Sequence, residues 1–108
     1  MSKSKAERLD LINGLMDKPA LLALFTLYVF KRALKTEIRD IILQAHREKY
    51  HLDTISKRLN KLKEAGLVTQ VNTHWELTDK GRDYVKKLIQ TFADLWDWLG
   101  PLEKIKKT

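Results

Sequence analysis

The chain has 108 residues, of which 44% are hydrophobic and 32% charged, and its formal net charge is +7. A chain of this length can bury one modest core, so we expect a single domain. The absence of cysteine excludes disulfides, cysteine-based zinc sites and thiol nucleophiles, and it is typical of an intracellular protein. The three histidines lack metal-ligand spacing, so we expect neither a metal nor a cofactor.

An amphipathic helix is expected within residues 1–17. Its apolar side chains, among them Leu9, Ile12 and Met16, recur at helical spacing. Because this helix has no core of its own to fill, we expect it to pack across the two-fold axis of a homodimer. The alternative is that it packs on the C-terminal helix of the same chain.

Residues 20–30 form the most hydrophobic stretch of the chain. The stretch is too short for a membrane span, which needs about 20 residues, and no signal-peptide cleavage pattern follows it. We expect a helix buried on nearly all sides, with Pro19 in its first turn. Burial on all sides in so small a protein suggests that a partner chain covers part of this helix.

Residues 34–46 are expected to begin with a brief strand, Leu34-Lys35, and to continue as a helix capped by Thr36. Helical spacing predicts one apolar face, made of Ile38, Ile41, Ile42 and Ala45. This helix would support the next one. In the turn that follows, Tyr50 could fill the edge of the core or bond a phosphate.

Residues 52–66 predict a second amphipathic helix that ends at a glycine. Its apolar stripe is Leu52, Ile55, Leu59 and Leu62, and the opposite face carries Asp53, Lys57, Asn60, Lys61 and Glu64. From Lys49 to Lys63 there are five cations and one anion, so much of the positive charge falls here. Such a face is also typical of any solvated helix, whereas clustered cations are typical of DNA binding.

Two strand-forming runs follow, residues 67–71 and 75–78, joined through Asn72-Thr73-His74 as a tight hairpin. Thr78 is a good N-cap for the next helix, and Asp79 suits the positive end of its dipole.

The segments K-R-L-N-K-L-K-E-A-G-L-V and W-E-L-T-D-K-G-R resemble winged helix-turn-helix transcription regulators of the MarR and PadR kind and their small archaeal relatives. The resemblance covers about residues 20–99. It implies a mainly α fold with a small β-hairpin wing, N- and C-terminal dimerisation helices, and binding of double-stranded DNA. Family wings usually carry cations at the tip, whereas this tip offers Gln70, Asn72, Thr73 and His74.

Residues 79–99 are expected to form one helix of about 31 Å at 1.5 Å per residue, which Gly100-Pro101 ends. A helix this long should find a second surface. We therefore expect a homodimer interface made by Leu9, Ile12, Val85, Leu88, Phe92, Leu95, Trp96 and Leu99. The domain organisation is then a dimerisation helix (1–17), a winged helix-turn-helix core (18–78), and a long helix with a basic tail (79–108).

The expected function is sequence-specific binding of double-stranded DNA by a homodimeric transcription regulator, located in the cytoplasm with the nucleoid. The expected DNA contacts are Thr54, Ser56, Lys57, Arg58, Asn60, Lys61 and Lys63. Lys57 and Asn60 suit base edges, whereas Arg58, Lys61 and Lys63 suit phosphates. The alternatives are a non-specific architectural DNA-binding protein and a winged-helix protein-interaction module.

An enzyme is not expected, because the chain lacks a nucleophile elbow, a glycine-rich phosphate loop and a paired-carboxylate motif. Nothing in the sequence names an effector ligand.

Overall fold

The computed structural model describes residues 17–107. Its elements are α2 (Lys18–Phe30), β1 (Arg32–Ala33), α3 (Lys35–His46), α4 (Leu52–Glu64), β2 (Val68–Val71), β3 (His74–Leu77), α5 (Asp79–Thr91), the 3-10 turn η1 (Ala93–Leu95) and α6 (Trp96–Lys107). This part of the chain is mainly helical with a small antiparallel sheet, as expected. The helix predicted within residues 1–17, with Leu9 and Ile12, lies outside the described residues apart from Asp17.

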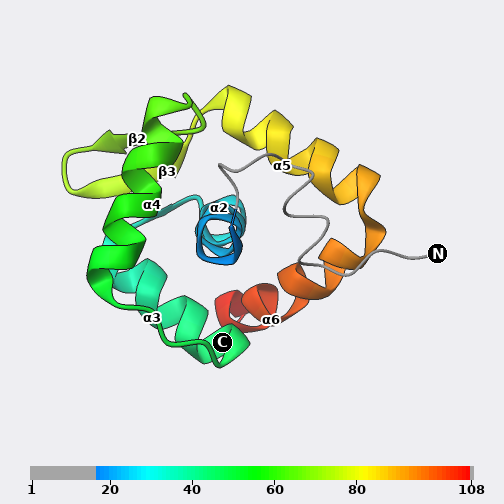
Figure 1. The fold of residues 1–108 in the computed structure, drawn as a ribbon. Coiled ribbons are helices and arrows are strands. Elements are labelled where there is room, and N and C mark those ends of the chain that lie inside the picture. Colours follow the sequence, from blue (N-terminus) through cyan, green and yellow to red (C-terminus); the bar gives the residue numbers. More distant parts are fainter. Residues whose placement is uncertain (1–16, 108) are drawn as a thin grey trace.

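Helix α2 is the centre of the molecule. Figure 1 looks along its axis and shows α3, α4, α5 and α6 arranged around it. The side chains from Ala20 to Leu27 are at most 1% exposed. The buried hydroxyl of Thr26 has a hydrogen-bond partner, because it donates to the carbonyl of Leu22 at 2.8 Å. The buried helix is confirmed. The suggestion that a partner chain covers it is wrong, because helices of the same chain pack on it.

Two residues fix the start of helix α2: Asp17, which precedes the helix, and Pro19, which lies in its first turn. The carboxylate of Asp17 accepts from the backbone N–H of Ala20 at 3.1 Å, which satisfies one of the donors that every helix start leaves unpaired. Pro19 lies in the first turn, where its missing N–H costs nothing.

The strands form one sheet in the order β1-β3-β2, with both pairs antiparallel. Strands β2 and β3 are joined by the two residues Asn72 and Thr73, and Asn72 has a φ of 58°, a left-handed conformation that asparagine tolerates better than most residues. The predicted hairpin is therefore confirmed.

The brief strand lies at Arg32–Ala33, not at Leu34-Lys35 as expected. It pairs with β3, where Ala33 is opposite Trp75. The cap of α3 is also different from the one predicted at Thr36. Leu34 is the N-cap residue, and the Glu37 carboxylate accepts from its backbone N–H at 2.8 Å, so the side chain inside the first turn satisfies the helix start.

Hydrogen bonds made by Thr78 connect the segment after α4 to the start of α5. Thr78 accepts from the N–H of Gly81 at 3.0 Å and donates to the carbonyl of Gly66 at 2.6 Å. A Cβ built on Gly81 would lie 1.9 Å from the carbonyl oxygen of Leu67. Packing between these two segments therefore explains much of the sequence pattern G-L-V at residues 66–68 and L-T-D-K-G at residues 77–81.

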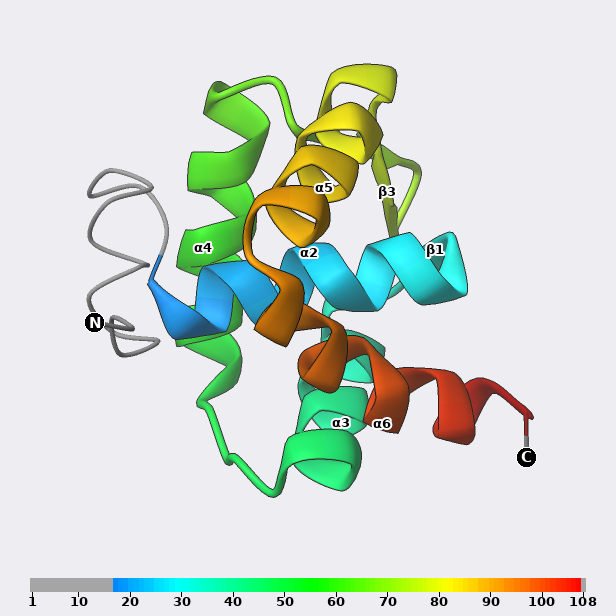
Figure 2. The ribbon, with the colours of Figure 1, turned by 90° about the vertical axis from the view of Figure 1, so that its right-hand side faces the viewer.

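The expected single helix over residues 79–99 is wrong. Helix α5 ends at Thr91, Phe92 leaves the helical conformation with φ −122° and ψ 86°, and a 3-10 turn leads into α6. Helix α6 turns back over α2 and α3 (Figure 2). It also continues through Gly100 and Pro101 instead of stopping there.

This reversal changes the expected dimer interface. Val85, Leu88, Leu95 and Leu99 are 0%, 6%, 3% and 2% exposed, because they fill the core of their own chain. Phe92 is half-buried, and Trp96 is 58% exposed. The physical reason is that a reversed helix buries its apolar seam against α2 without needing a second chain. Of the described residues predicted for the interface, only Trp96 lies mainly on the surface.

Candidate nucleic-acid interface

Helix α4 separates an apolar side from a charged side, as predicted. Ile55, Leu59 and Leu62 have no exposed surface and pack into the core. The exposed residues of the helix are polar or charged: Asp53, Lys57, Asn60, Lys61, Lys63 and Glu64. Thr54 and Ser56 lie between the two sides and are half-buried. We call the exposed residues the α4 outer face.

Lys57 is paired on the α4 outer face with the carboxylate one turn earlier. Its Nζ lies 3.1 Å from Oδ2 of Asp53, and the two side chains are 70% and 76% exposed. Such an exposed pair contributes about 0 to 1 kcal/mol. Lys57 can therefore exchange this carboxylate for another acceptor at little cost.

Arg58 lies in a different environment from the neighbouring lysines. Its Nε is 2.6 Å from Oδ2 of Asp17, and its side chain is only 27% exposed. This ion pair ties the middle of α4 to the start of α2. A phosphate contact by Arg58, as the sequence suggested, would have to compete with this internal carboxylate.

Lys61 and Lys63 are the most available cations of the outer face. Both are exposed, and neither forms an ion pair with any residue between 17 and 107. Because they lie near the C-terminal end of α4, they also interact favourably with the helix dipole.

The connection between α3 and α4 is held by a small polar network. Glu48 accepts from Nζ of Lys18 at 2.5 Å through one oxygen and from the hydroxyl of Tyr50 at 3.1 Å through the other. Burial, and then the charge of Glu48, raise the pKa of Tyr50 to about 12. Nζ of Lys18 also lies 5.6 Å from the ring centre of Trp98.

This network places Tyr50 at the edge of the core, one of the two positions that the sequence left open. Sequence reasoning missed Asp17, Lys18 and Glu48. The Asp-Lys-Pro run signals a helix start, but nothing local indicates which distant side chain its carboxylate and ammonium groups meet.

The hairpin lies next to α4 on the same side of the molecule (Figure 1). Its tip is exposed and uncharged: Gln70, Val71, Asn72 and Thr73. It therefore adds hydrogen-bonding and apolar groups beside the α4 outer face, but no cation.

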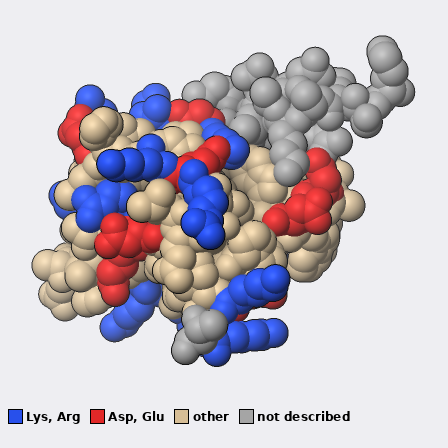
Figure 3. Space-filling model, turned by 90° about the horizontal axis from the view of Figure 1, so that it is seen from below, with Lys and Arg blue, Asp and Glu red and all other residues tan. Residues whose placement is uncertain are grey.

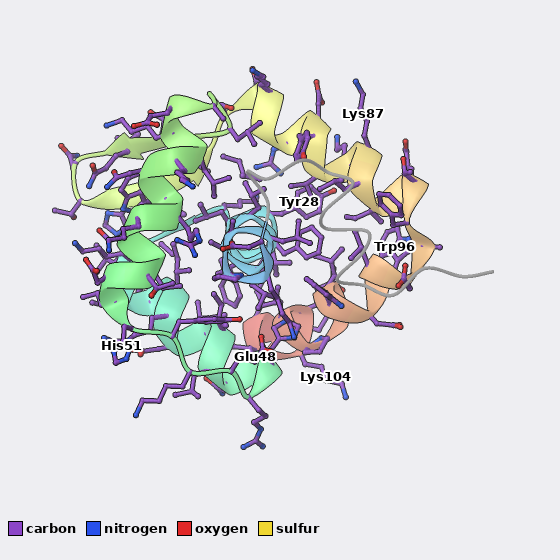
Figure 4. The ribbon with its side chains drawn as sticks, viewed as in Figure 1. Tyr28, Glu48, His51, Lys87, Trp96 and Lys104 are labelled. Carbon is purple, nitrogen blue, oxygen red and sulfur yellow. The ribbon has the colours of Figure 1, made fainter. Side chains whose placement is uncertain are left out.

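Charge elsewhere on the surface is mixed. The side formed by α3 and α6 shows acidic and basic side chains next to one another (Figure 3). Lys86 and Lys87 are exposed on α5, and Lys87 points away from the body on a different side from α4 (Figure 4). Lys86 and Lys87 are therefore control positions, because they carry positive charge outside the candidate interface.

No protein-family model and no curated protein matches the chain. Of the helices between residues 17 and 107, none has both the length and the apolar character needed to cross a membrane.

Proposed function

We propose that this protein is a sequence-specific, double-stranded DNA-binding transcription regulator with a winged helix-turn-helix fold, which acts as a homodimer. The observation that carries the proposal is the α4 outer face, where Lys57, Asn60 and Lys61 lie opposite a stripe with no exposed surface and Lys63 is exposed at its side. A helix of this kind fits the major groove of B-form DNA, which is about 12 Å wide.

The surrounding elements support the same proposal. Helix α3 packs against α4, the hairpin follows α4 directly, and β1 joins the sheet beside β3. This order is that of a helix-turn-helix followed by a wing. In a homodimer, two α4 helices would enter successive major grooves about 34 Å apart, so the proposed DNA site is pseudo-palindromic.

The residues of the outer face take different roles in this proposal. Lys57 and Asn60 read base edges, because lysine donates to guanine and asparagine pairs with adenine through two hydrogen bonds. Lys61 and Lys63 bind phosphates, and Thr54 and Ser56 add contacts beside them. Arg58 is removed from the phosphate contacts because Asp17 holds it.

Selection of bound sequences from a random duplex pool at two salt concentrations tests the proposal. A recurrent pseudo-palindromic motif with salt-dependent affinity supports it. Shallow sequence preference with cooperative coating would instead indicate an architectural DNA-binding protein. No salt-sensitive affinity for any duplex would contradict DNA binding and favour a protein-interaction module.

A matched pair of variants localises the binding surface. The double substitution Lys61→Ala/Lys63→Ala removes two cations from the α4 outer face, and Lys86→Ala/Lys87→Ala removes two from α5. We expect the first to reduce the magnitude of the slope of log affinity against log salt by about two for each bound subunit, hence by about four for the dimer, and the second to leave it unchanged. Equal effects of the two variants would contradict the placement of DNA on α4.

A further inference from the structure

Trp96 is a large aromatic side chain that the fold leaves 58% exposed. It lies at the start of α6 beside a shallow hollow of about 670 Å³ between that helix and the C-terminal end of α3. The hollow is lined along α6 by Trp96, Asp97, Gly100, Pro101, Lys104 and Ile105. We call these residues the α6 face.

The α6 face has a symmetric pattern about Gly100 and Pro101. Its residues lie in pairs at equal distances on either side of that point in the sequence: Trp96 and Ile105, Asp97 and Lys104. Each pair has complementary chemistry, one apolar and the other of opposite charge. A second copy of the helix running in the opposite direction would therefore set each member of a pair against the other.

We propose that the α6 face binds the α6 face of a second copy of this chain, with the two helices antiparallel across a two-fold axis beside Gly100 and Pro101. In this arrangement Trp96 covers Ile105 of the partner subunit, and Asp97 faces Lys104 of the partner subunit. Both contacts occur twice, as in any isologous two-fold interface.

The charges at the two ends of α6 favour this occupant. The helix carries Asp97 in its first turn and Lys104, Lys106 and Lys107 in its last turn. That distribution also suits the helix dipole and alone would indicate nothing. Combined with the exposed tryptophan at the start of the helix and Ile105 near its end, it makes the face self-complementary.

The small residue at the centre allows the two helices to approach closely. A Cβ added at Gly100 would meet nothing within 4 Å, so the surface there is open. Tryptophan is among the residues that contribute most to the binding energy of protein interfaces. Lys104 points away from the body of the molecule, where a partner can reach it (Figure 4).

The inference takes from the proposed function only that the protein pairs with itself, and it replaces the interface expected from the sequence. Because Leu95 and Leu99 fill the core, the outer side of the same helical segment is left for the partner. A contact over a few helical turns is small, so we expect a dimer that dissociates on dilution.

Sedimentation velocity without DNA, over a range of protein concentrations, tests the inference with a charge swap. We expect Asp97→Lys and Lys104→Asp each to weaken the dimer about tenfold or more, since each sets like charges opposite one another. The combined variant Asp97→Lys/Lys104→Asp should recover most of the wild-type affinity, because it restores both pairs with exchanged signs. Trp96→Ala should also weaken the dimer about tenfold or more, and the charge swap should not restore the affinity of this variant.

Lys87→Asp, a charge reversal on α5, is the control and should leave the dimer unchanged. Thermal melts of every variant show whether the monomer still folds. A wild-type protein that stays monomeric at the highest concentration, single variants that dimerise normally, or a double variant that does not recover would each overturn the inference. The duplex selection above is independent, since a monomer can still bind DNA and a dimer through α6 can form without it.

Discussion

One carboxylate joins the start of the central helix to the candidate DNA-binding helix. Oδ1 of Asp17 accepts from the N–H of Ala20, and Oδ2 lies 2.6 Å from Nε of Arg58. The residues of the ion pair are 41 positions apart in the sequence. Arg58 therefore serves first to hold α4 against α2, and its charge is partly neutralised before DNA arrives.

The pairing of Asp17 with Arg58 predicts an unusual result for DNA binding. Arg58→Ala should leave the salt slope almost unchanged, whereas Asp17→Asn should increase its magnitude by about one for each bound subunit, because the released guanidinium can then bind a phosphate. In the Asp17→Asn background, Arg58→Ala should remove that gain. Salt titrations of duplex affinity measure all four proteins, and a slope whose magnitude falls by about one per bound subunit in Arg58→Ala alone would show that Arg58 already binds phosphate.

Stability separates the two roles of Asp17. Asparagine caps helices about as well as aspartate, so Asp17→Asn should cost at most about 1 kcal/mol for the partly exposed ion pair. Asp17→Ala loses the cap as well and should cost about 1 kcal/mol more. Urea denaturation measures both, and equal losses in the two variants would contradict the capping role.

Features with a local cause were predictable from the sequence. The apolar stripe of α4, the hairpin turn at Asn72 and the cap at Thr78 each depend on residues a few positions apart. The structure bears out all three. The partners of Asp17 and Glu48 were not predictable, because no local pattern indicates which distant charge a folded chain brings near.

The reversal between α5 and α6 shows a second limit. Leu88, Phe92, Leu95 and Leu99 keep a regular 4-3-4 spacing through the break. A straight helix and two helices joined by a short 3-10 turn therefore have the same apolar pattern. Only packing against α2 distinguishes them, and the continuation past Pro101 has the same cause, since Leu99 and Leu102 are buried on either side of it.

The α4 outer face predicts two different effects of removing a lysine. Lys57→Ala should lower discrimination between the preferred site and random duplex by about 1–3 kcal/mol. Lys63→Ala should weaken both duplexes alike and reduce the magnitude of the salt slope by about one for each bound subunit. Competition binding with the two duplexes measures these effects, and a Lys57 variant with unchanged discrimination would contradict base reading by this residue.

Asp53 supplies the complementary test of the same face. Asp53→Asn removes the carboxylate that pairs with Lys57 and leaves one more net positive charge on α4. We expect tighter binding to every duplex, by a few-fold at low salt and less at high salt. Asp83→Asn, an exposed carboxylate on α5, is the control, and an equal gain in that variant would indicate an effect of net charge alone.

The joint between α4 and α5 predicts a large loss of stability from a small substitution. In Gly81→Ala the new methyl group would lie 1.9 Å from the carbonyl oxygen of Leu67, so the backbone must move. We expect a loss of at least about 2 kcal/mol in the free energy of unfolding, measured by urea denaturation. Lys86→Ala, exposed on the same helix, should change it by less than about 0.5 kcal/mol.

The raised pKa of Tyr50 predicts how stability changes at alkaline pH. The phenol has a pKa of about 12 in the folded protein, compared with 10.0 when unperturbed, because burial and Glu48 disfavour the phenolate. Between these two values the unfolded chain loses a proton that the folded protein keeps. The free energy of unfolding should therefore fall as pH rises from about 10 to about 12.

Tyr50→Phe removes this group, so the variant should lose stability less steeply across that interval. It should also be less stable than the wild type at neutral pH by about 1 kcal/mol, through loss of the hydrogen bond to Glu48. Part of the alkaline slope should persist in both proteins, because burial also raises the pKa of Tyr84. Urea denaturation at pH 8, 10 and 11.5 compares the two proteins, and parallel pH profiles would contradict the buried position of the Tyr50 hydroxyl beside Glu48.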